Sequence, residues 1–234
     1  MVQAVRSMIR PRLTAAAINL FQANGYDKTT VDEIAEAAGV ARRTFFRHFR
    51  AKEDAVFPDH DDCLRRVEAH LNGADPGQPP LKVLGAATHL VLAMYAEDPV
   101  LAVRRYKLIR AVEPLREREL TTTSRYQRML ADYLHRRLGG QDQQRLLQEI
   151  AAAMVVTTHN FVLRQWLRDG GAGDPHPRLD TALATVGKAF PGWLRAESGT
   201  EPADGDSEVL VLRIRPDTPL WRIAEEIESA ANRY

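Results

Sequence analysis

Apolar residues recur with a helical period along most of the chain. Near the N-terminus they occupy Leu13, Ala17, Leu20 and Phe21, three or four positions apart, and Gly25 follows where helices commonly end. The same spacing predicts five further helices, over residues 81–97, 99–113, 115–138, 143–169 and 178–196. At about 1.5 Å per residue, the segment 143–169 would form one helix of about 40 Å. The pattern predicts an all-α protein.

Between the first helix and the later ones, the sequence carries the signals of a helix-turn-helix. A short helix is expected to begin after Thr30, because Glu33 stands three residues later and completes a capping box. Gly39 ends this helix and permits a tight turn into a third helix over about 41–49. A fourth helix is expected to begin at 52 and to reach toward 71. In a helix-turn-helix, the second helix of the motif enters the major groove of DNA.

The C-terminal part has a different pattern. Residues 197–207 have the composition of a flexible linker, and in 208–215 valine and arginine alternate with leucine and isoleucine, which predicts a strand. Residues 219–232 would form a last short helix. A single strand leaves its backbone groups without partners, so we expect it to pair with the same strand of a second subunit. An apolar tail that docks on the body, or is disordered, is an equal alternative.

Charge is distributed unevenly along a chain whose formal net charge is only +1. Residues 1–53 hold nine Lys or Arg against five Asp or Glu, whereas residues 54–234 hold 23 against 26. This distribution predicts an anionic partner for the N-terminal part alone. Cys63 is the only cysteine, which fits a reducing cytoplasm, and no run of about 18 apolar residues suggests a membrane span.

The third helix concentrates the positive charge. Arg42, Arg43, Thr44 and Arg47 fall on or near its outward N-terminal side, where side chains can reach base edges. An arginine fork matches the two acceptors of guanine, a pairing worth ~1–3 kcal/mol in discrimination. A solvated charged face on an ordinary helix is the alternative.

Other residues of this segment would support the helix or bind the DNA backbone. Phe45 and Phe49 are four positions apart and are expected to face inward. His48 and Lys52 are placed where a phosphate backbone would pass, and such contacts give affinity without reading sequence.

The segment 25–57 closely resembles the DNA-binding domain of TetR-family transcriptional regulators. The shared motif consists of Gly25-Tyr26, Thr29-Thr30-Val31, Ile34-Ala35, Ala38-Gly39-Val40, Thr44-Phe45-Phe46-Arg47-His48-Phe49 and Lys52-Glu53. The resemblance implies DNA contacts at Thr30, Arg42, Arg43, Thr44, Phe46, His48 and Lys52. Two positions depart from the family pattern. Phe46 stands where a tyrosine is usual, and Ala41 stands where a serine would cap the helix, a loss of ~1 kcal/mol.

The resemblance also implies how the chain is divided. Residues 1–53 would form the helix-turn-helix domain, 54–197 a helical ligand-binding and dimerisation domain, and 198–234 a linker with the strand and helix extension. The protein would be a homodimer joined through 143–169 and 178–196, two helices from each subunit. Its recognition helices would meet successive major grooves of a roughly palindromic operator, about 34 Å or more apart. Repression, relieved by a small-molecule effector, is the family's commoner mode.

An effector cavity is implied among the central helices. The candidates to line it are aromatic, methionine and arginine residues of the later helices, Met94, Tyr95, Tyr106, Arg110, Met129, Tyr133, Met154, Phe161 and Trp166. Tyr126 and His159 belong to the same segments. For any single residue, a place in the ordinary core is the alternative.

The effector is expected to be apolar. Residues 104–120 loosely resemble the sensor domain of a subgroup linked to fatty-acyl or acyl-CoA ligands, and few acidic residues fall on the apolar faces. Arg104, Arg105 or Arg110 could meet a carboxylate or phosphate, or could pair with Glu97 or Glu113.

Two other classes of function are alternatives to a ligand-responsive regulator. The chain has none of the compact signatures HExxH, GxSxG or GxxxxGK[ST], so no enzyme activity and no cofactor are expected. Asp59, His60, Asp62 and Cys63 could suggest a metal-dependent enzyme. Neighbours on a helix point in different directions, however, and an exposed acidic turn is the simpler reading. The other alternative is a DNA-binding regulator that senses no small molecule.

Overall fold

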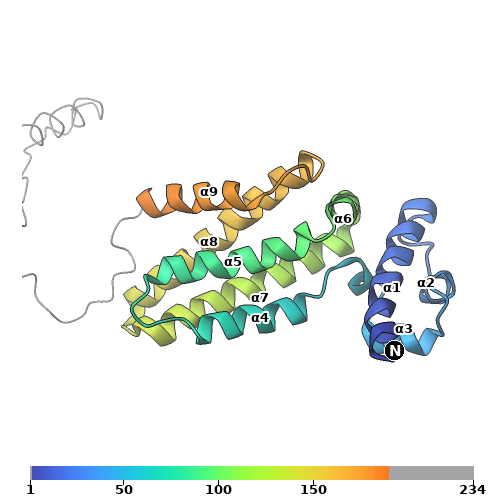
Figure 1. The fold of residues 1–234 in the computed structure, drawn as a ribbon, viewed down its shortest axis with the longest axis horizontal. Helices are drawn as coiled ribbons and strands as arrows, with labels where there is room; N and C mark the ends of the chain where they lie inside the picture. The colour runs from blue at the N-terminus through green and yellow to red at the C-terminus, as the bar shows by residue number, and fades with distance from the viewer. Residues whose placement is uncertain (1, 190–234) are drawn as a thin grey trace, which may run out of the picture. The chain divides into compact units, whose positions relative to one another are not determined.

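The computed structural model describes residues 2–189, and the side chains from 9 to 188. Its elements are α1 (Val2–Asn24), α2 (Val31–Ala37), α3 (Arg42–His48), the 3-10 turn η1 (Glu53–Val56), α4 (His60–Asn72), α5 (Pro80–Ala96), α6 (Pro99–Ala111), α7 (Glu113–Leu138), α8 (Asp142–Arg168) and α9 (His176–Ala189) (Figure 1). No strand occurs within the described residues, so the all-α prediction is confirmed there. The predicted strand 208–215, the helix 219–232 and residues 190–196 of the 178–196 helix lie outside them.

The prediction of one helix over 52–71 is wrong, because the helix is interrupted at Pro58. The preceding residue, Phe57, is extended, with φ −84° and ψ 151°, as a residue before proline usually is. Only the short turn η1 forms ahead of the break. The carboxylate of Asp59 then accepts a hydrogen bond from the backbone N–H of Asp62 at 3.0 Å and caps α4.

The first helix is longer than the apolar pattern of 13–21 predicts. Polar contacts hold its N-terminal half against the rest of the head, which we define as residues 2–57. The Arg10 guanidinium donates to the carbonyl of His48 at 3.1 Å and lies 4.6 Å from the centre of the Phe49 ring. The Arg12 guanidinium donates to the carbonyl of Ala38. Hydrophobic periodicity does not register such contacts.

The core of the head continues into the helices that follow it. Phe45 and Phe49 are buried as expected, with exposed fractions of 0% and 3%, and pack with apolar residues of α1 and α2. Leu108 and Ile109 of α6 and Leu115 of α7 belong to the same apolar cluster. The head therefore shares its hydrophobic core with α6 and α7.

The remaining helices form a bundle in which α8 is central. α8 packs against α5, α6, α7 and α9, and the helix 143–169 was predicted almost to its ends. By length and composition alone α8 could cross a membrane, although its apolar residues are interrupted by polar ones and form no run of about 18. Its buried residues, which include Val155 and Trp166, instead contribute to two apolar clusters of the bundle.

Candidate DNA-binding surface and ligand cavity

The helix-turn-helix forms as its sequence signals predict. The backbone N–H of Thr30 donates to the Glu33 carboxylate at 2.7 Å, and the Thr30 hydroxyl accepts from the Glu33 N–H at 3.3 Å, which completes the capping box. The Thr30 hydroxyl also donates to the Glu33 carboxylate at 2.9 Å. The two bonds that this carboxylate accepts from Thr30, the backbone one first, hold the pKa of Glu33 below its usual value. Gly39 has φ +63° and turns the chain into α3, whose N-cap Ala41 makes no side-chain hydrogen bond.

The outward side of α3 is basic and carries one aromatic ring. Arg42, Arg43 and Arg47 are exposed, and Phe46 is 45% exposed, a large fraction for a phenylalanine. Thr44 is half-buried. Phe45 is the buried residue of this seven-residue helix and anchors it, while the exposed side chains are presented to a partner.

The arginines on this surface differ in what they already bind. Arg42 forms an ion pair with Asp32 of α2, and its guanidinium lies 5.3 Å from the centre of the Phe46 ring. Arg43 and Arg47 make no ion pair within the described residues. We conclude that Arg42 is held in place between the two helices, whereas Arg43 and Arg47 are available to an incoming anion.

His48 and Lys52 have contacts that the sequence did not predict. Burial, and then the charges of Arg47 and Arg10, lower the pKa of His48, and its Nε2 is buried with no partner within residues 2–189. The Lys52 ammonium donates to the carbonyls of Tyr26 at 2.7 Å and Thr29 at 3.1 Å. Lys52 therefore closes the turn that leads into α2, and its contact with phosphate stays a prediction.

A small cavity lies inside the bundle, between α4, α5, α7 and α8. Its volume is about 50 Å³, which is room for a few water molecules. Apolar side chains form most of its wall, including Val91, Leu130 and Val156. Polar side chains interrupt this wall at His60, Thr88, Tyr95, Glu119, Thr122, Tyr126, His159 and Asn160. An apolar cavity with a few placed polar groups is typical of a small-molecule site.

Three of the polar residues form a network. The Nδ1 atom of His60 lies 3.0 Å from the Tyr126 hydroxyl, and its Nε2 atom lies 3.4 Å from the Tyr95 hydroxyl. Burial lowers the pKa of His60 to about 3, so the ring is neutral at pH 7. One ring nitrogen then donates and the other accepts. Burial also raises the pKa of both tyrosines, and the network carries no net charge.

His159 and Glu119 are the other titratable groups in the wall. Burial, and then the charge of His89, lower the pKa of His159 to about 4, and its Nδ1 is buried with no partner among the described residues. Burial raises the pKa of Glu119, against the opposing effect of Arg164 and Arg110. Glu119 is the single acidic residue among the described lining residues, in keeping with the expectation that few acidic residues would fall on the apolar faces.

Of the nine residues predicted for the effector site, Tyr95 lines this cavity. Met94 borders a separate hollow next to α1, and Met129 and Met154 pack at the edge of the apolar cluster shared by α4, α5, α7 and α8. Phe161 is 60% exposed on α8. Trp166 is fully buried, with its indole N–H donating to the carbonyl of Gly173 at 3.0 Å.

The three remaining predicted residues, Tyr106, Arg110 and Tyr133, take part in contacts between arginines and tyrosines. The Tyr106 hydroxyl accepts from Arg168 at 3.3 Å and from Arg110 at 3.4 Å, and the Tyr133 hydroxyl accepts from Arg137. Helical periodicity identified the apolar sides of the helices, but it did not show which residues of each helix face the cavity.

Two arginines of α6 connect the bundle to the head. The Arg104 guanidinium donates to the side-chain oxygen of Gln22 on α1 at 3.0 Å, and that of Arg105 donates to the backbone carbonyl of Val56. Neither pairs with Glu97 or Glu113, because both reach across to the head. They add polar contacts to the shared hydrophobic core.

The segment 58–63 is not the exposed acidic turn that we expected. His60 and Cys63 are buried, and only the aspartates reach the surface, where Asp61 pairs with Arg125 and Asp62 with Arg65, both at 2.7 Å. The potential ligands thus point to different surroundings, and no group of three or more such side chains converges in the described part of the chain.

An anchored helix-turn-helix with a basic outward face defines a DNA-binding protein of the helix-turn-helix class. Comparison with known proteins agrees. Residues 13–56 match the family model described as bacterial regulatory proteins, tetR family, and residues 78–191 match the model of the MftR C-terminal domain.

Relatives and solved structures point the same way. The chain is 29% identical over 167 residues to the mycofactocin biosynthesis transcriptional regulator MftR of Mycobacterium tuberculosis, which covers 70% of this chain and 82% of that protein. It is 28% identical to the HTH-type transcriptional regulator TcmR of Streptomyces glaucescens over 77% of this chain and 79% of that one. The regulator FadR of Bacillus subtilis, solved with stearoyl-CoA, has the same fold, with a TM-score of 0.53 at 19% identity, over 77% and 98% of the two chains.

The chain belongs to the TetR family of transcriptional regulators. It is a DNA-binding regulator and not an enzyme.

Proposed function

We propose that this protein is a cytoplasmic, homodimeric repressor that binds a roughly palindromic operator and is released by a small effector. Residues 1–53 would bind DNA, and residues 54–197 would bind the effector and the second subunit. The observation that carries the proposal is the exposed basic face of α3. Phe45 and Phe49 anchor the helix by their burial, and Arg43 and Arg47 on the exposed face make no ion pair with any described residue.

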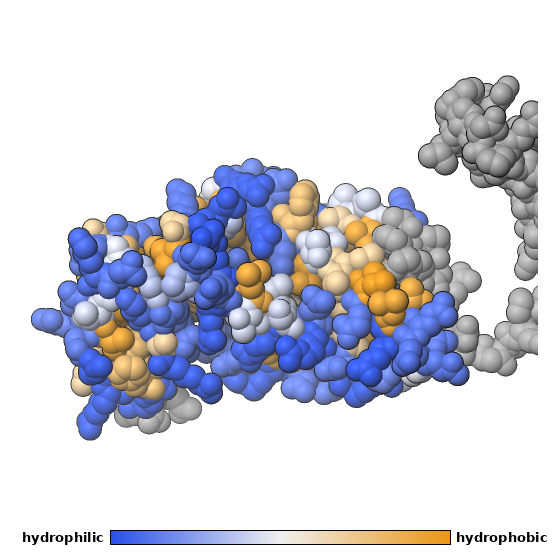
Figure 2. Space-filling model, turned by 180° about the vertical axis from the view of Figure 1, so that it is seen from behind, coloured by the Kyte–Doolittle hydropathy of each residue, from blue (hydrophilic) through white to orange (hydrophobic). Residues whose placement is uncertain are grey.

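Dimerisation through α8 and α9 is supported by the surface of α8. Leu146 and Phe161 are each 60% exposed, and Ile150, Met154 and Thr157 lie between them at helical spacing on the same side. Exposed apolar stripes of this kind commonly mark protein interfaces. Figure 2 shows one face of the molecule, where hydrophobic patches in orange interrupt the blue hydrophilic surface of the bundle. Two such stripes would bury each other in a symmetric contact.

The effector is proposed to be a fatty-acyl or acyl-CoA compound whose apolar part enters the cavity of the bundle. The mostly apolar wall and the neutral His60–Tyr126–Tyr95 network favour an uncharged, apolar group there. The cavity of about 50 Å³ is smaller than a long acyl chain, so binding requires the helices around it to move apart. Because α7 also packs against the head, such a movement could shift the head and lower its affinity for DNA.

The same small volume favours a second candidate, a DNA-binding regulator that senses no small molecule. In that case the cavity is a packing defect with a few polar groups, and the bundle serves only for dimerisation. Calorimetry with acyl probes separates the two candidates, because only a sensor binds them.

Fluorescence anisotropy with a duplex from the region flanking the protein's own gene tests the DNA-binding proposal. We expect binding that resists an excess of unrelated DNA and weakens steeply with salt. Arg43→Ala should lower the affinity for this duplex by about tenfold or more, in line with the ~1–3 kcal/mol of an arginine–base contact.

Arg128→Ala is the matched control, since Arg128 is an equally exposed arginine on α7, away from α3. Its affinity for the duplex should equal that of the parent protein. If Arg43→Ala binds as tightly as the parent, Arg43 does not read bases. If no sequence selected from a random pool binds the parent, the proposal of a sequence-reading regulator fails.

A further inference from the structure

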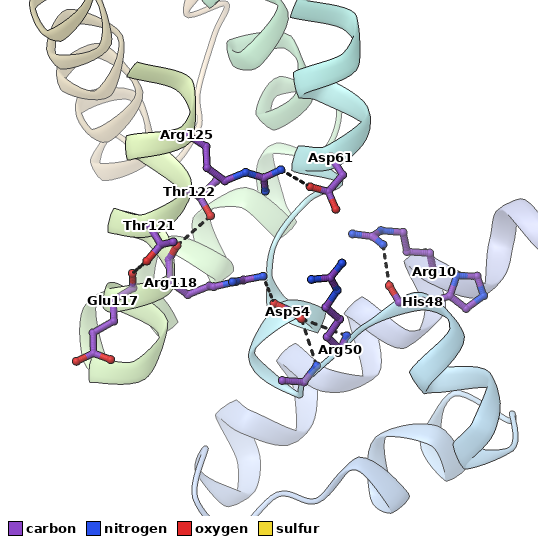
Figure 3. Close-up of polar contacts among 11 residues, drawn as sticks. Arg10, His48, Arg50, Asp54, Asp61, Glu117, Arg118, Thr121, Thr122 and Arg125 are labelled. Atoms are coloured by element: carbon purple, nitrogen blue, oxygen red, sulfur yellow. Dashed lines mark hydrogen bonds and ion pairs between the residues drawn. The ribbon is translucent and has the colours of Figure 1, made fainter. Parts of the chain in front are cut away.

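A second hollow lies where the head meets the bundle. Its volume is about 340 Å³, several times that of the bundle cavity, and its wall comes from α1, the segment 48–61 and α7. Four arginines line it, Arg10 and Arg50 from the head and Arg118 and Arg125 from α7. We call this hollow the junction recess. Figure 3 shows the four side chains converging on it from the two parts of the molecule.

The positive charge of the junction recess exceeds its negative charge. Asp54 and Asp61 are the only carboxylates among its described lining residues. Asp54 pairs with Arg118 at 2.7 Å and also accepts from the backbone N–H groups of Arg50 and Ala51 at 3.2 Å. Asp61 pairs with Arg125 at 2.7 Å, so both carboxylates are already engaged.

The positive charges of Arg10 and Arg50, the two arginines of the head, are neutralised less than those of Arg118 and Arg125. Arg10 contacts Asp59 at 3.3 Å, and Asp59 borders the neighbouring hollow rather than this one. The side chain of Arg50 makes no hydrogen bond or ion pair with any described residue. In Figure 3 its guanidinium projects between those of Arg10, Arg118 and Arg125 without a marked interaction. Like charges held close together repel one another, and an anion placed among them would remove that repulsion.

A phosphate-type group fits this arrangement best. Guanidinium groups bind phosphate oxygens with two parallel hydrogen bonds, and several can share one phosphate. A volume of about 340 Å³ exceeds that of a bare ion and falls within the range of sites for whole small molecules. The chemistry therefore favours a phosphate that belongs to a larger compound.

The junction recess adjoins the bundle cavity. Phe57, His60 and Thr122 line both of them, so one molecule could reach from one into the other. We propose that the junction recess binds the phosphate-bearing end of the effector while the apolar end occupies the bundle cavity. This inference rests on the proposed function, since it assigns the charged part of the same ligand.

Such a ligand would act directly on the position of the head. Two of the four arginines move with the head and two with α7, so a phosphate bound by all four fixes the distance between them. The ion pair between Asp54 of η1 and Arg118 of α7 crosses the same junction and would compete with the ligand for Arg118. The ligand then favours one head position over another by its contacts on both sides.

Calorimetric titration of the full-length protein tests the inference with four probes: lauroyl-CoA, lauric acid, coenzyme A and inorganic pyrophosphate. We expect lauroyl-CoA to bind at least tenfold more tightly than lauric acid. Arg50→Gln should weaken the binding of lauroyl-CoA about tenfold and leave the binding of lauric acid unchanged, because Arg50 would contact only the phosphate end of the ligand. Arg65→Gln, an exposed arginine of α4 outside the recess, is the matched control and should bind all four probes like the parent.

The outcomes separate this inference from the proposed effector class. If both acyl probes bind and Arg50→Gln changes neither, the recess assignment is overturned and the acyl effector stands. If pyrophosphate binds the parent and not Arg50→Gln while no acyl probe binds, the recess is a phosphate site and the acyl effector is wrong. If no probe binds, the recess assignment is overturned. If Arg50→Gln leaves the binding of all probes unchanged and weakens DNA binding with a shallower salt dependence, Arg50 is a DNA-phosphate contact instead.

Discussion

Neighbouring arginines on α3 differ in their surroundings, although the sequence presents them as one basic run. Arg42 is held by Asp32 and by the Phe46 ring, and its charge is partly compensated before DNA arrives. Arg43, one position later, is exposed and makes no ion pair with any described residue. Successive helix positions are rotated by about 100°, so adjacent residues of the same type meet different partners.

At the same scale, Gly39 provides a test of the helix-turn-helix. Its φ of +63° lies in the left-handed region, and a Cβ there would stand 2.9 Å from the Arg12 guanidinium. Gly39→Ala should therefore lower the free energy of unfolding by about 1–2 kcal/mol from backbone strain, and further by displacing Arg12 from the Ala38 carbonyl. Thermal unfolding followed by circular dichroism measures the loss.

Gly25→Ala is the matched variant. Gly25 has a similar φ of +85°, but a Cβ there would meet nothing within 4 Å. In Gly25→Ala the free energy of unfolding should fall only by the cost of backbone strain, and therefore by less than in Gly39→Ala. Equal losses would mean that the Arg12 side chain moves aside without cost.

At the scale of elements, α8 serves both the inside and the outside of the bundle. One side holds buried residues such as Val155 and Leu163, and the other exposes Leu146 and Phe161. The sequence identified Met154 and Phe161 as candidates for the effector site because they are apolar. Phe161 is exposed in the single chain and Met154 is half-buried beside it on the same side, so both are candidates for the contact between subunits instead.

Phe161→Arg tests this assignment of α8. A charge within an apolar contact between subunits would be desolvated without a partner, so we expect the variant to be monomeric where the parent is dimeric. Sedimentation velocity at several concentrations measures the change. Leu120→Arg on α7 replaces an equally exposed residue, 62% against 60%, and should remain dimeric. Dissociation of Leu120→Arg alone would move the interface to α7.

At the scale of the whole molecule, two buried histidines couple stability to pH. The pKa of His60 falls from 6.5 to about 3 and that of His159 to about 4, mainly because burial disfavours the charged form. Between these values and pH 6.5 the unfolded chain binds more protons than the folded one. The free energy of unfolding therefore falls as the pH falls through that window.

Urea denaturation at pH 7.5 and at pH 5.5 measures the effect. Each histidine should lower the free energy of unfolding by about 1.4 kcal/mol over this interval, or about 3 kcal/mol for the two. In His159→Gln the loss over this interval should shrink by about 1.4 kcal/mol. An unchanged dependence in His159→Gln would show that another group titrates.

Local signals in the sequence determined the head and most of the bundle. The capping box at Thr30, the turn at Gly39 and the inward Phe45 and Phe49 depend on neighbours within a few residues, and the structure confirms them. The helical spacing of apolar residues over 143–169 likewise predicted α8. Pro58 is a further local signal: it keeps Phe57 in an extended conformation and so divides the helix expected over 52–71.

Tertiary structure alone decided which residues form the sites. The helical spacing of apolar residues indicates which side of a helix faces the core. It does not indicate whether a side chain on that side packs against another helix or lines the cavity between α4, α5, α7 and α8. The cavity is marked by polar residues on apolar stripes, such as Thr88 on α5, Tyr126 on α7 and His159 on α8, which converge only when the helices pack. The junction recess joins arginines up to 115 positions apart, from Arg10 to Arg125, and no local pattern predicts such a meeting.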